Sequence, residues 1–460
     1  MPFDGGVIAA VATAWGEAAI AIIRLSGEGS AALADNFFRG ARPLSLETPR
    51  RMILGNISDG ADVVDQVLAV RFERGSSYTG EESVEVHCHG GMGAARRCLG
   101  LFMKGGARPA LPGEFTKRAF LSGRIDLAQA EAVLGVIRAR SDAELASSSR
   151  ALQGELSACV RKLSGRLTSL LAEIEARIDF PDDVDGAEYA GFKTVAYETK
   201  EKTLALLERC RVGMTLRNGV RVAIVGRPNA GKSSLLNAML ESDRAIVTNI
   251  PGTTRDTLDA VLIHRGLAVT LVDTAGLRES TPASGAGVIE SIGVERSLNA
   301  IKGADLCLLV VDVSSPLTGE DFAASEAALE KPAILAANKS DLRSVLADDE
   351  LEALGNFTAR LGVSAITGAG VNDLKNAVFE AVLGLASPSD GMMATGRMVN
   401  ALEEAAKLMD DAARILGTSR CMDVAGSLLL EAAEFLSSLL GTDASEALLD
   451  EIFSAFCIGK

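Results

Sequence analysis

Aromatic residues are scarce in this sequence. Phe, Trp and Tyr make up 4% of its 460 residues, whereas hydrophobic residues of all kinds make up 48%. The core must therefore consist mainly of Leu, Ile, Val and Ala, which favours helices and α/β units over an all-β sandwich. A chain of this length can bury two or three separate cores, so we expect several domains.

Paired cysteines and long apolar runs are also missing. The seven cysteines are scattered, odd in number and never spaced CxxC, so neither a disulfide framework nor a zinc ribbon is expected. No apolar run is long enough to span a bilayer, and the first residues, MPFDGGVIAA, lack the basic segment of a signal peptide. These absences predict a cytoplasmic protein with no membrane partner.

Positive charge is in deficit over the whole chain. The formal net charge of −15 argues against a protein that coats nucleic acid over its entire surface. A local exception lies between residues 96 and 124, where Glu114 is the single acid. This segment is either a solvated rim or a site for an anionic partner such as tRNA, and both interpretations stay open. Its basic residues are Arg96, Arg97, Lys104, Arg108, Lys117, Arg118 and Arg124.

The chain changes character along its length. Residues 1–120 combine β-like runs, AIAIIRLSG and SVEVHCHGG, with glycine-rich turns, and predict an α+β domain. Helical patterns fill 121–216 and return over 383–460. Between them, residues 217–382 alternate apolar runs with helical lengths, as in a parallel sheet covered on both faces. We therefore expect an α/β domain inserted into one helical domain.

Two apolar stripes at helical spacing define the helical domain. The first predicts one helix of roughly seven turns that ends at DFPDD, 179–183, because proline cannot continue a helix. Further helices are expected over 427–440 and 446–456. The two stripes are Leu152, Leu156, Val160, Leu163, Leu167, Leu170, Ile174 and Ile178, and Leu402, Ala405, Leu408, Ala412 and Ile415.

A phosphate-binding signature opens the α/β segment. GRPNAGKSS, 226–234, follows an apolar run and begins a helical one, so it matches GxxxxGK[ST] in the context that this motif requires. Backbone N–H groups and Lys232 would hold the phosphates, and Ser233 would bind magnesium. Alone, this motif predicts a nucleotide site of unspecified base.

Three further motifs select guanine. DTAG, 273–276, and NKSD, 338–341, end two later apolar runs, and SA, 364–365, follows them. Asp273 would hold magnesium through water, and Asp341 would accept hydrogen bonds from the N1–H and amino groups of guanine. Motifs in this order at strand ends predict a Ras-like P-loop G domain. The expected GTP-binding residues are Asn229, Ala230, Gly231, Lys232, Ser233, Ser234, Thr248, Asn249, Ile250, Pro251, Gly252, Thr253, Thr254, Asp273, Thr274, Ala275, Gly276, Asn338, Lys339, Asp341, Ser364 and Ala365.

The glutamine that positions water in Ras-like enzymes is absent. Its place after DTAG is held by Leu277, which has no polar group to orient water. Asn229 can instead offer an oxygen to a monovalent cation, and the segment VTNIPGTTRD, 247–256, can supply backbone carbonyls. Beyond DTAG, Glu290 and Glu295 are candidate carboxylates, although a solvated helix face is the simpler interpretation of each.

The motifs together carry a specific resemblance. With PGTTRD, DTAGLR, NKSD, PGEFTKRAFLSGRIDLAQAEAV and the terminal FCIGK, the chain closely resembles the MnmE (TrmE) family of tRNA modification GTPases over its whole length. The resemblance implies a homodimer formed by an N-terminal tetrahydrofolate-binding domain, and a G domain activated by potassium. It also implies an FAD-dependent partner, MnmG (GidA). The pair would install an aminomethyl-type group, such as carboxymethylaminomethyl, at carbon five of the wobble uridine of certain tRNAs.

Matching motifs carry the family's site residues onto this chain. The resemblance assigns magnesium to Ser233 and Thr254, and the positioning of catalytic water to Glu290. The segment between DTAG and this Glu is longer here than in the family. Potassium would be surrounded by Asn229, Thr248, Ile250 and Thr253.

The same resemblance implies a site for a methylene- or formyl-tetrahydrofolate. Its residues would be Arg24, Glu85, Arg124 and Lys460, where family members often carry Lys in place of Arg124. Alternation along strand 84–89 places Glu85, His87 and His89 on one face, where a carboxylate could hydrogen-bond the amino-pyrimidine edge of a pterin. With one further histidine in the chain, His264, we expect no metal at HCH.

The segment FCIGK has two interpretations. In the first, Gly459 caps the last helix, Lys460 offsets its negative end, and Cys457 is a small buried hydrophobe. In the second, which the resemblance implies, this tail lies at the folate pocket, Lys460 binds folate and Cys457 is a catalytic thiol.

Two other functions remain as alternatives. A ribosome-assembly GTPase that acts as an RNA-binding switch would also use PGTTRD and DTAG, but the chain has neither a second G domain nor a KH-type GXXG module. A dimerisation scaffold, in which the nucleotide only locks a conformation, predicts full tRNA modification in cells that carry Asp273→Ala.

Overall fold

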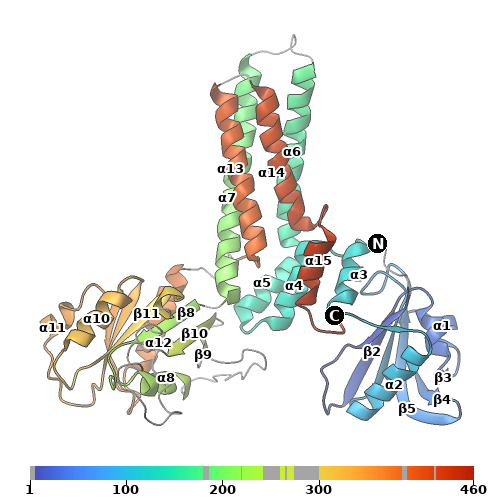
Figure 1. The fold of residues 1–460 in the computed structure, drawn as a ribbon, viewed down its shortest axis with the longest axis horizontal. Helices are drawn as coiled ribbons and strands as arrows, with labels where there is room; N and C mark the ends of the chain where they lie inside the picture. Colours follow the sequence, from blue (N-terminus) through green and yellow to red (C-terminus); the bar gives the residue numbers. More distant parts are fainter. Residues whose placement is uncertain are drawn as a thin grey trace, which may run out of the picture. The chain divides into compact units, whose positions relative to one another are not determined.

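The structure is a computed structural model, and it describes residues 6–179, 186–218, 220–241, 259–264, 267–273, 300–385, 391–418 and 421–460. The chain divides into two compact units. One comprises Met1–Leu134, Ala151–Thr203 and Ala401–Lys460, and the other comprises Gly135–Arg150 and Leu204–Asn400. The expected class, with an α+β part, a helical part and a Ras-like α/β part, is confirmed (Figure 1). The domain boundaries at 120, 216 and 382 stay predictions.

A seven-stranded sheet forms the amino-terminal part of the first unit. Its strand order is β3-β4-β5-β6-β2-β1-β7. Neighbouring strands are antiparallel, except that β1 and β7 are parallel. The strands are β1 (Ile8–Val11), β2 (Ile20–Ser26), β3 (Phe38–Gly40), β4 (Ile53–Asp59), β5 (Asp62–Phe72), β6 (Ser83–His89) and β7 (Arg108–Pro109).

The two faces of this sheet differ. Helices α1 (Ser30–Asp35) and α2 (Met92–Lys104) supply buried residues to a core with Val84, Val86 and Cys88 of β6. Because alternate residues of a strand point to opposite faces, Glu85 and His87 lie on the other face. Next to β1, Phe115 of α3 (Glu114–Leu121) packs against that second face.

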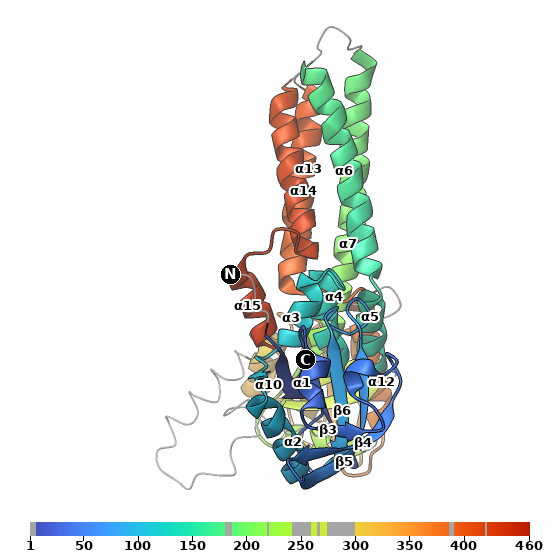
Figure 2. The ribbon, with the colours of Figure 1, turned by 90° about the vertical axis from the view of Figure 1, so that its right-hand side faces the viewer.

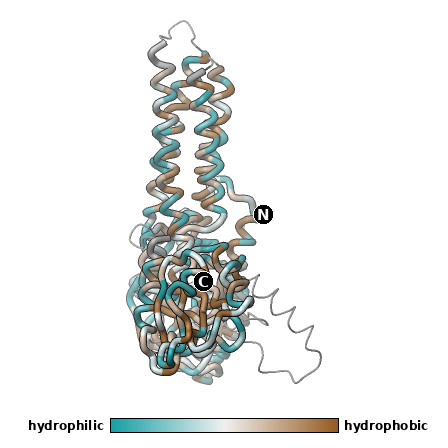
Figure 3. Tube along the Cα trace, turned by 90° about the vertical axis from the view of Figure 1, so that its left-hand side faces the viewer, coloured by the Kyte–Doolittle hydropathy of each residue, from teal (hydrophilic) through white to brown (hydrophobic). Residues whose placement is uncertain are grey.

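Four long helices lie side by side as a bundle (Figures 1 and 2). Along them apolar and polar residues alternate, as Figure 3 shows by colour, which is the pattern of helices with one buried stripe. They are α6 (Glu155–Asp179), α7 (Gly186–Asn218), α13 (Gly396–Thr418) and α14 (Met422–Leu440).

The sequence patterns predicted these helices with three errors. The first stripe is not one helix, because Gly154 adopts φ +89 between α5 (Asp142–Leu152) and α6. Ile178 at the end of α6 is exposed rather than buried. In α13 the buried stripe continues through Met409 and Leu416 in place of Leu408 and Ile415.

The expected helices 427–440 and 446–456 correspond to α14 and to a shorter helix, α15 (Glu446–Ser454). α14 begins at Met422, five positions before the expected 427, and α15 packs beside α3 (Figure 1). α4 (Leu127–Arg138) buries Leu127 and Leu134 against Phe453 of α15. None of the described helices is long and apolar enough to cross a lipid bilayer.

The second unit contains a six-stranded sheet. Its order is β13-β12-β11-β8-β10-β9, parallel throughout except for the antiparallel edge strand β9. The apolar runs before GRPNAGKSS, DTAG and NKSD form β8, β10 and β12, whereas β9 and β13 were not predicted. The strands are β8 (Val220–Val225), β9 (Asp259–His264), β10 (Leu267–Asp273), β11 (Leu306–Asp312), β12 (Ala333–Asn338) and β13 (Ala359–Gly362).

Helices cover both faces of this sheet. α8 (Lys232–Glu241) and α12 (Val371–Leu385) share one core with alternate strand residues. α10 (Gly319–Ala328) packs on the opposite face, where the segment after α11 (Asp348–Glu352) also contributes buried residues. All seven residues of β11 are buried, as expected for a central strand between two layers. The carboxyl ends of β8, β11 and β12 therefore meet at one edge, where ligands bind in such sheets.

Candidate functional site

Two glycines of the phosphate loop after β8 lie very close to neighbouring atoms. Gly226 has φ +143, and a Cβ on it would lie 2.3 Å from the carbonyl oxygen of Val310. A Cβ on Gly231 would lie 2.2 Å from Nδ2 of Asn338. Neither position tolerates a side chain without displacing its neighbour. Lys232 is buried, and its Nζ donates hydrogen bonds to the carbonyls of Gly226 at 2.7 Å and Arg227 at 2.8 Å, within the loop.

The residues expected to recognise guanine are joined to this loop. Nδ2 of Asn338 donates to the carbonyl of Ala230 at 2.9 Å, and Oδ1 of Asn338 accepts from the backbone N–H of Ala365 at 3.2 Å. Oγ of Ser364 donates to Oδ1 of Asp341 at 2.5 Å. The structure thus brings together three motifs that lie far apart in the sequence.

Backbone conformation marks the same place. Among the described residues other than glycine, three have positive φ: Arg50, Asn229 at φ 61 and Lys339 at φ 65. Two of these three lie in the predicted nucleotide site. Residues other than glycine rarely adopt this left-handed backbone conformation, and those that do cluster where function requires it.

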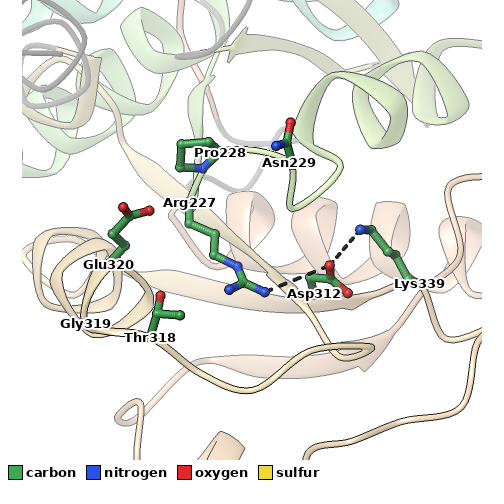
Figure 4. A pocket seen from close by; sticks show the side chains of 8 residues that line it. All are labelled: Arg227, Pro228, Asn229, Asp312, Thr318, Gly319, Glu320 and Lys339. Carbon is green, nitrogen blue, oxygen red and sulfur yellow. Dashed lines mark hydrogen bonds and ion pairs between the residues drawn. The ribbon is translucent and has the colours of Figure 1, made fainter. Parts of the chain in front are cut away.

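A cavity of about 720 Å³ adjoins the phosphate loop. In Figure 4, Asp312 at the end of β11 lies between two cations. Its Oδ2 is 2.6 Å from Nζ of Lys339 and 3.9 Å from Nη2 of Arg227. Burial raises the pKa of the Asp312 carboxyl, but hydrogen bonds from Lys339 and Ser314 outweigh burial and leave that pKa below its ordinary value. The carboxylate therefore stays charged and links the guanine motif electrostatically to the phosphate loop.

Sequence reasoning missed Arg227 and Asp312. A signal was present, because Asp312 ends a buried run in the same way as Asp273 and Asn338 end theirs. In a parallel sheet, a polar residue at that position shares an edge with the motif residues.

Several predicted residues lie outside the described part of the chain. These are Leu277, Glu290 and Glu295, the segment Thr248–Thr254, and Thr274, Ala275 and Gly276. Asp273 is described as the last residue of β10. The potassium ligands, Thr254 as a magnesium ligand and the catalytic Glu290 therefore stay predictions.

A second cluster of candidate site residues lies on the face of the amino-terminal sheet opposite α1 and α2. Arg24 on β2 stands directly opposite Glu85 on β6, and its Nε donates to Oε1 of Glu85 at 2.9 Å. The guanidinium carbon of Arg24 lies 5.2 Å from the ring centre of Tyr78 and 5.6 Å from that of Phe115. Two aromatic rings thus form a wall beside a largely buried ion pair.

The carboxyl-terminal tail docks beside this wall. The backbone N–H of Phe115 donates to the carbonyl of Lys460 at 3.2 Å, and that of Gly113 donates to the carbonyl of Cys457 at 3.5 Å. Gly459 has φ +96, and a Cβ on it would lie 2.4 Å from the carbonyl oxygen of Val11. The motifs PGEF and FCIGK therefore contact each other, and Phe115 contacts both Lys460 and Arg24.

These contacts correct one interpretation of the tail. Gly459 does not cap the last helix, because α15 ends at Ser454 with Ala455 as its C-cap. Cys457 is exposed, so it is not a small buried hydrophobe. The alternative role, a catalytic thiol, stays a prediction.

Arg124 is placed differently from the other expected folate residues. It is exposed, and its Nη1 donates to the carbonyl of Gly75 at 3.2 Å. Gly75 belongs to the loop between β5 and β6 that also carries Tyr78. This hydrogen bond brings Arg124 to the loop rather than to the Arg24–Glu85 pair itself.

The basic segment 96–124 is largely neutralised within the chain. Glu114 is almost fully buried and accepts hydrogen bonds from Arg108 at 3.0 and 2.5 Å and from Arg118 at 3.2 Å. Burial raises the pKa of Glu114, yet the hydrogen bonds from Arg108 and Leu111 outweigh it and lower that pKa. Lys117 pairs with Asp450 at 2.5 Å. Arg108, Lys117 and Arg118 are thus paired with acids of the chain itself, and binding of an anionic partner by the segment stays a prediction.

Family models match both parts of the chain. The model described as MnmE helical domain matches residues 127–457, which is more than half of the chain. The model described as GTP-binding protein TrmE N-terminus matches residues 7–124.

Similar proteins extend over nearly the whole sequence. The tRNA modification GTPase MnmE of Moorella thermoacetica is 43% identical over 466 residues, covering 98% of this chain and 99% of that protein. The protein of the same name from Thermotoga maritima is 39% identical over 455 residues, with the same two coverages of 98% and 99%. Among solved structures, the G domain of the T. maritima iron transporter FeoB is 30% identical, covers 35% of this chain and 97% of that one, and has a TM-score of 0.27.

With so low a TM-score, the assignment rests on the sequence comparisons and on the site geometry. Identity near 40% over full length, two matching family models and the joined nucleotide motifs agree. The chain belongs to the MnmE family of tRNA modification GTPases, and it is a GTP-hydrolysing enzyme that acts in tRNA modification.

Proposed function

We propose that this chain couples potassium-activated GTP hydrolysis to folate-dependent modification of the wobble uridine in certain tRNAs. Its partner would be an FAD-dependent protein of the MnmG (GidA) type, and the group would be added at carbon five. The observation that carries the folate half is the meeting of Arg24, Glu85, Phe115 and the 457–460 tail on one face of the amino-terminal sheet.

The chemistry of this face suits a reduced folate. A carboxylate such as Glu85 accepts two hydrogen bonds from the amide and amino groups of a pterin, and the hydrogen bond from Arg24 fixes the position of that carboxylate. Tyr78 and Phe115 provide aromatic surface for a flat ring. Lys460 would add positive charge for an anionic part of the ligand. The bound folate would supply the one-carbon unit, while these residues bind and orient it.

At the nucleotide site, the chain's residues would divide two tasks. Lys232 and the backbone of the phosphate loop would neutralise phosphate charge, with Ser233 and Thr254 on magnesium. Asp341 and Asn338 would select guanine. Because Leu277 cannot orient water, Asn229 with Thr248, Ile250 and Thr253 would hold a potassium ion, and Glu290 would position water.

A homodimer is part of this proposal. The outer strands of the amino-terminal sheet expose large apolar side chains, including Leu54, Val63 and Leu68. Exposed apolar groups of this kind favour association. A second copy packed against these strands would cover the exposed side chains. We place the dimer in the cytoplasm, together with its tRNA substrate.

Turnover in different salts tests the potassium site. GTP hydrolysis should be several-fold faster in potassium chloride than in sodium chloride at equal ionic strength, because the larger cation fits a site of backbone and amide oxygens without water. Asn229→Ala should remove the preference while GTP binding persists. Equal rates of the unmodified chain in both salts would contradict a cation-assisted mechanism.

A further inference from the structure

One histidine on the sheet face that carries Glu85 has no hydrogen-bond partner in the described part of the chain. His87 lies two residues after Glu85 on β6, and the side chains of both point to the same face. Its Nε2 is buried but makes no hydrogen bond to any described residue, and Oε2 of Glu85 lies 3.7 Å away from it. Directly opposite His87 stand Leu68 on β5 and Ile22 on β2, which offer no polar group.

The next histidine on the strand shows the contrast. His89 is exposed, and its Nδ1 lies 2.6 Å from Oδ1 of Asp65. The two histidines therefore differ in their surroundings. His89 is exposed to solvent and paired with Asp65, whereas Nε2 of His87 is buried and unpaired. Leaving a buried donor or acceptor unsatisfied costs about 1–3 kcal/mol, so the unpaired nitrogen is available to a bound ligand.

The chemistry of a pterin says what that contact would be. The ring edge that pairs with a carboxylate carries two donors, N3–H and the 2-amino group. An acceptor flanks each end of this edge: the 4-oxo group lies beside N3–H, and ring N1 lies beside the 2-amino group. Whichever way the ring lies on Glu85, the atom beyond the paired edge therefore requires a donor from the protein. Neutral histidine protonated at Nε2 supplies such a donor.

We propose that His87 donates a hydrogen bond from Nε2 to the pterin ring of a reduced folate held by Glu85. This inference rests on the proposed folate site and adds a ring-reading residue to it. Arg24 and Glu85 are the charged side chains beside His87 on this face, and they are already paired with each other. The imidazole therefore offers a donor for the second position of the ring.

The test measures 5-formyl-tetrahydrofolate binding to the full chain by calorimetry. His87→Leu should weaken binding about tenfold, because one hydrogen bond of about 1.4 kcal/mol is lost. His87→Gln, which keeps a donor, should bind nearly as well as the unmodified chain. His89→Leu, the matched control on the same strand face, should leave affinity unchanged. GTP turnover of all three variants should match the parent, and the melting temperature of His87→Leu should not fall below that of the parent, because this variant removes an unpaired buried nitrogen.

The outcomes separate this inference from the proposed function. If the unmodified chain binds folate and His87→Leu binds equally well, His87 does not read the ring, although the folate site stands. Equal losses in His87→Leu and His87→Gln would also overturn the donor role. If the unmodified chain binds no folate, the proposed function fails and this assignment fails with it. His87→Ala removes the same donor should the Leu variant not fold.

Discussion

Asp341→Asn should lower the affinity for GTP on the order of 100-fold. The carboxylate would accept hydrogen bonds from N1–H and the amino group of guanine, and bonds to a charged acceptor contribute about 1.5–3 kcal/mol each. Asparagine would turn an N–H donor toward the amino group, which is itself a donor. Xanthine carries a carbonyl in place of that amino group, so the variant should gain activity with xanthosine triphosphate. Binding and turnover of both nucleotides measure the change.

The geometry around Asp341 makes this prediction specific. Ser364 donates to Oδ1 of Asp341, and Ala365 is held by Asn338, so the carboxylate is oriented before any base arrives. Asp348→Asn, an exposed acid on α11, makes the same charge change away from the site and should have no effect. Unaltered GTP affinity in Asp341→Asn would exclude this residue from base recognition.

Gly459→Val should abolish most folate binding, by at least about tenfold, while GTP affinity is unchanged. A β-branched residue rarely adopts φ +96, and its Cβ would lie 2.4 Å from the carbonyl of Val11. The strain and the clash together exceed the roughly 1.4 kcal/mol that corresponds to a tenfold change, so the tail should leave Phe115. Calorimetry with 5-formyl-tetrahydrofolate measures the loss, and nucleotide titration serves as the internal control.

Ile458→Ala is the matched variant for this experiment. Its side chain is exposed and the backbone needs no rearrangement, so folate affinity should equal that of the unmodified chain. If Gly459→Val binds folate as tightly as Ile458→Ala does, the docked tail is a structural contact only. Lys460 would then have no part in ligand binding.

The nucleotide site was largely predictable from the sequence because each motif determines the backbone conformation of its own segment. A glycine-rich loop after an apolar run fixes a strand, a turn and a helix, and β8 and α8 follow that order. Polar residues at the ends of buried runs then meet at one sheet edge. The link between Asp312, Lys339 and Arg227 was missed, since it depends on side chains reaching across neighbouring strand ends.

The amino-terminal site was less accessible to sequence reasoning. Strand alternation predicted that Glu85 and His87 share a face, but pairing with Arg24 depends on the register between β2 and β6. Neither strand alternation nor helical periodicity predicts the contact of Gly459 with Val11, because these residues lie more than four hundred positions apart in the chain. The ion pairs of the basic segment could not be predicted for the same reason. Its acidic partners Glu81 and Asp450 lie outside the segment.

Mass spectrometry of wobble uridines tests the central claim, that GTP hydrolysis at this site drives a modification of tRNA. The cells would lack this chain and would be complemented with either the unmodified sequence or Lys232→Ala. We predict that the unmodified sequence restores the group at carbon five and that Lys232→Ala leaves the uridine without it. Full modification with Lys232→Ala, or in cells with no copy of the chain, would contradict the account.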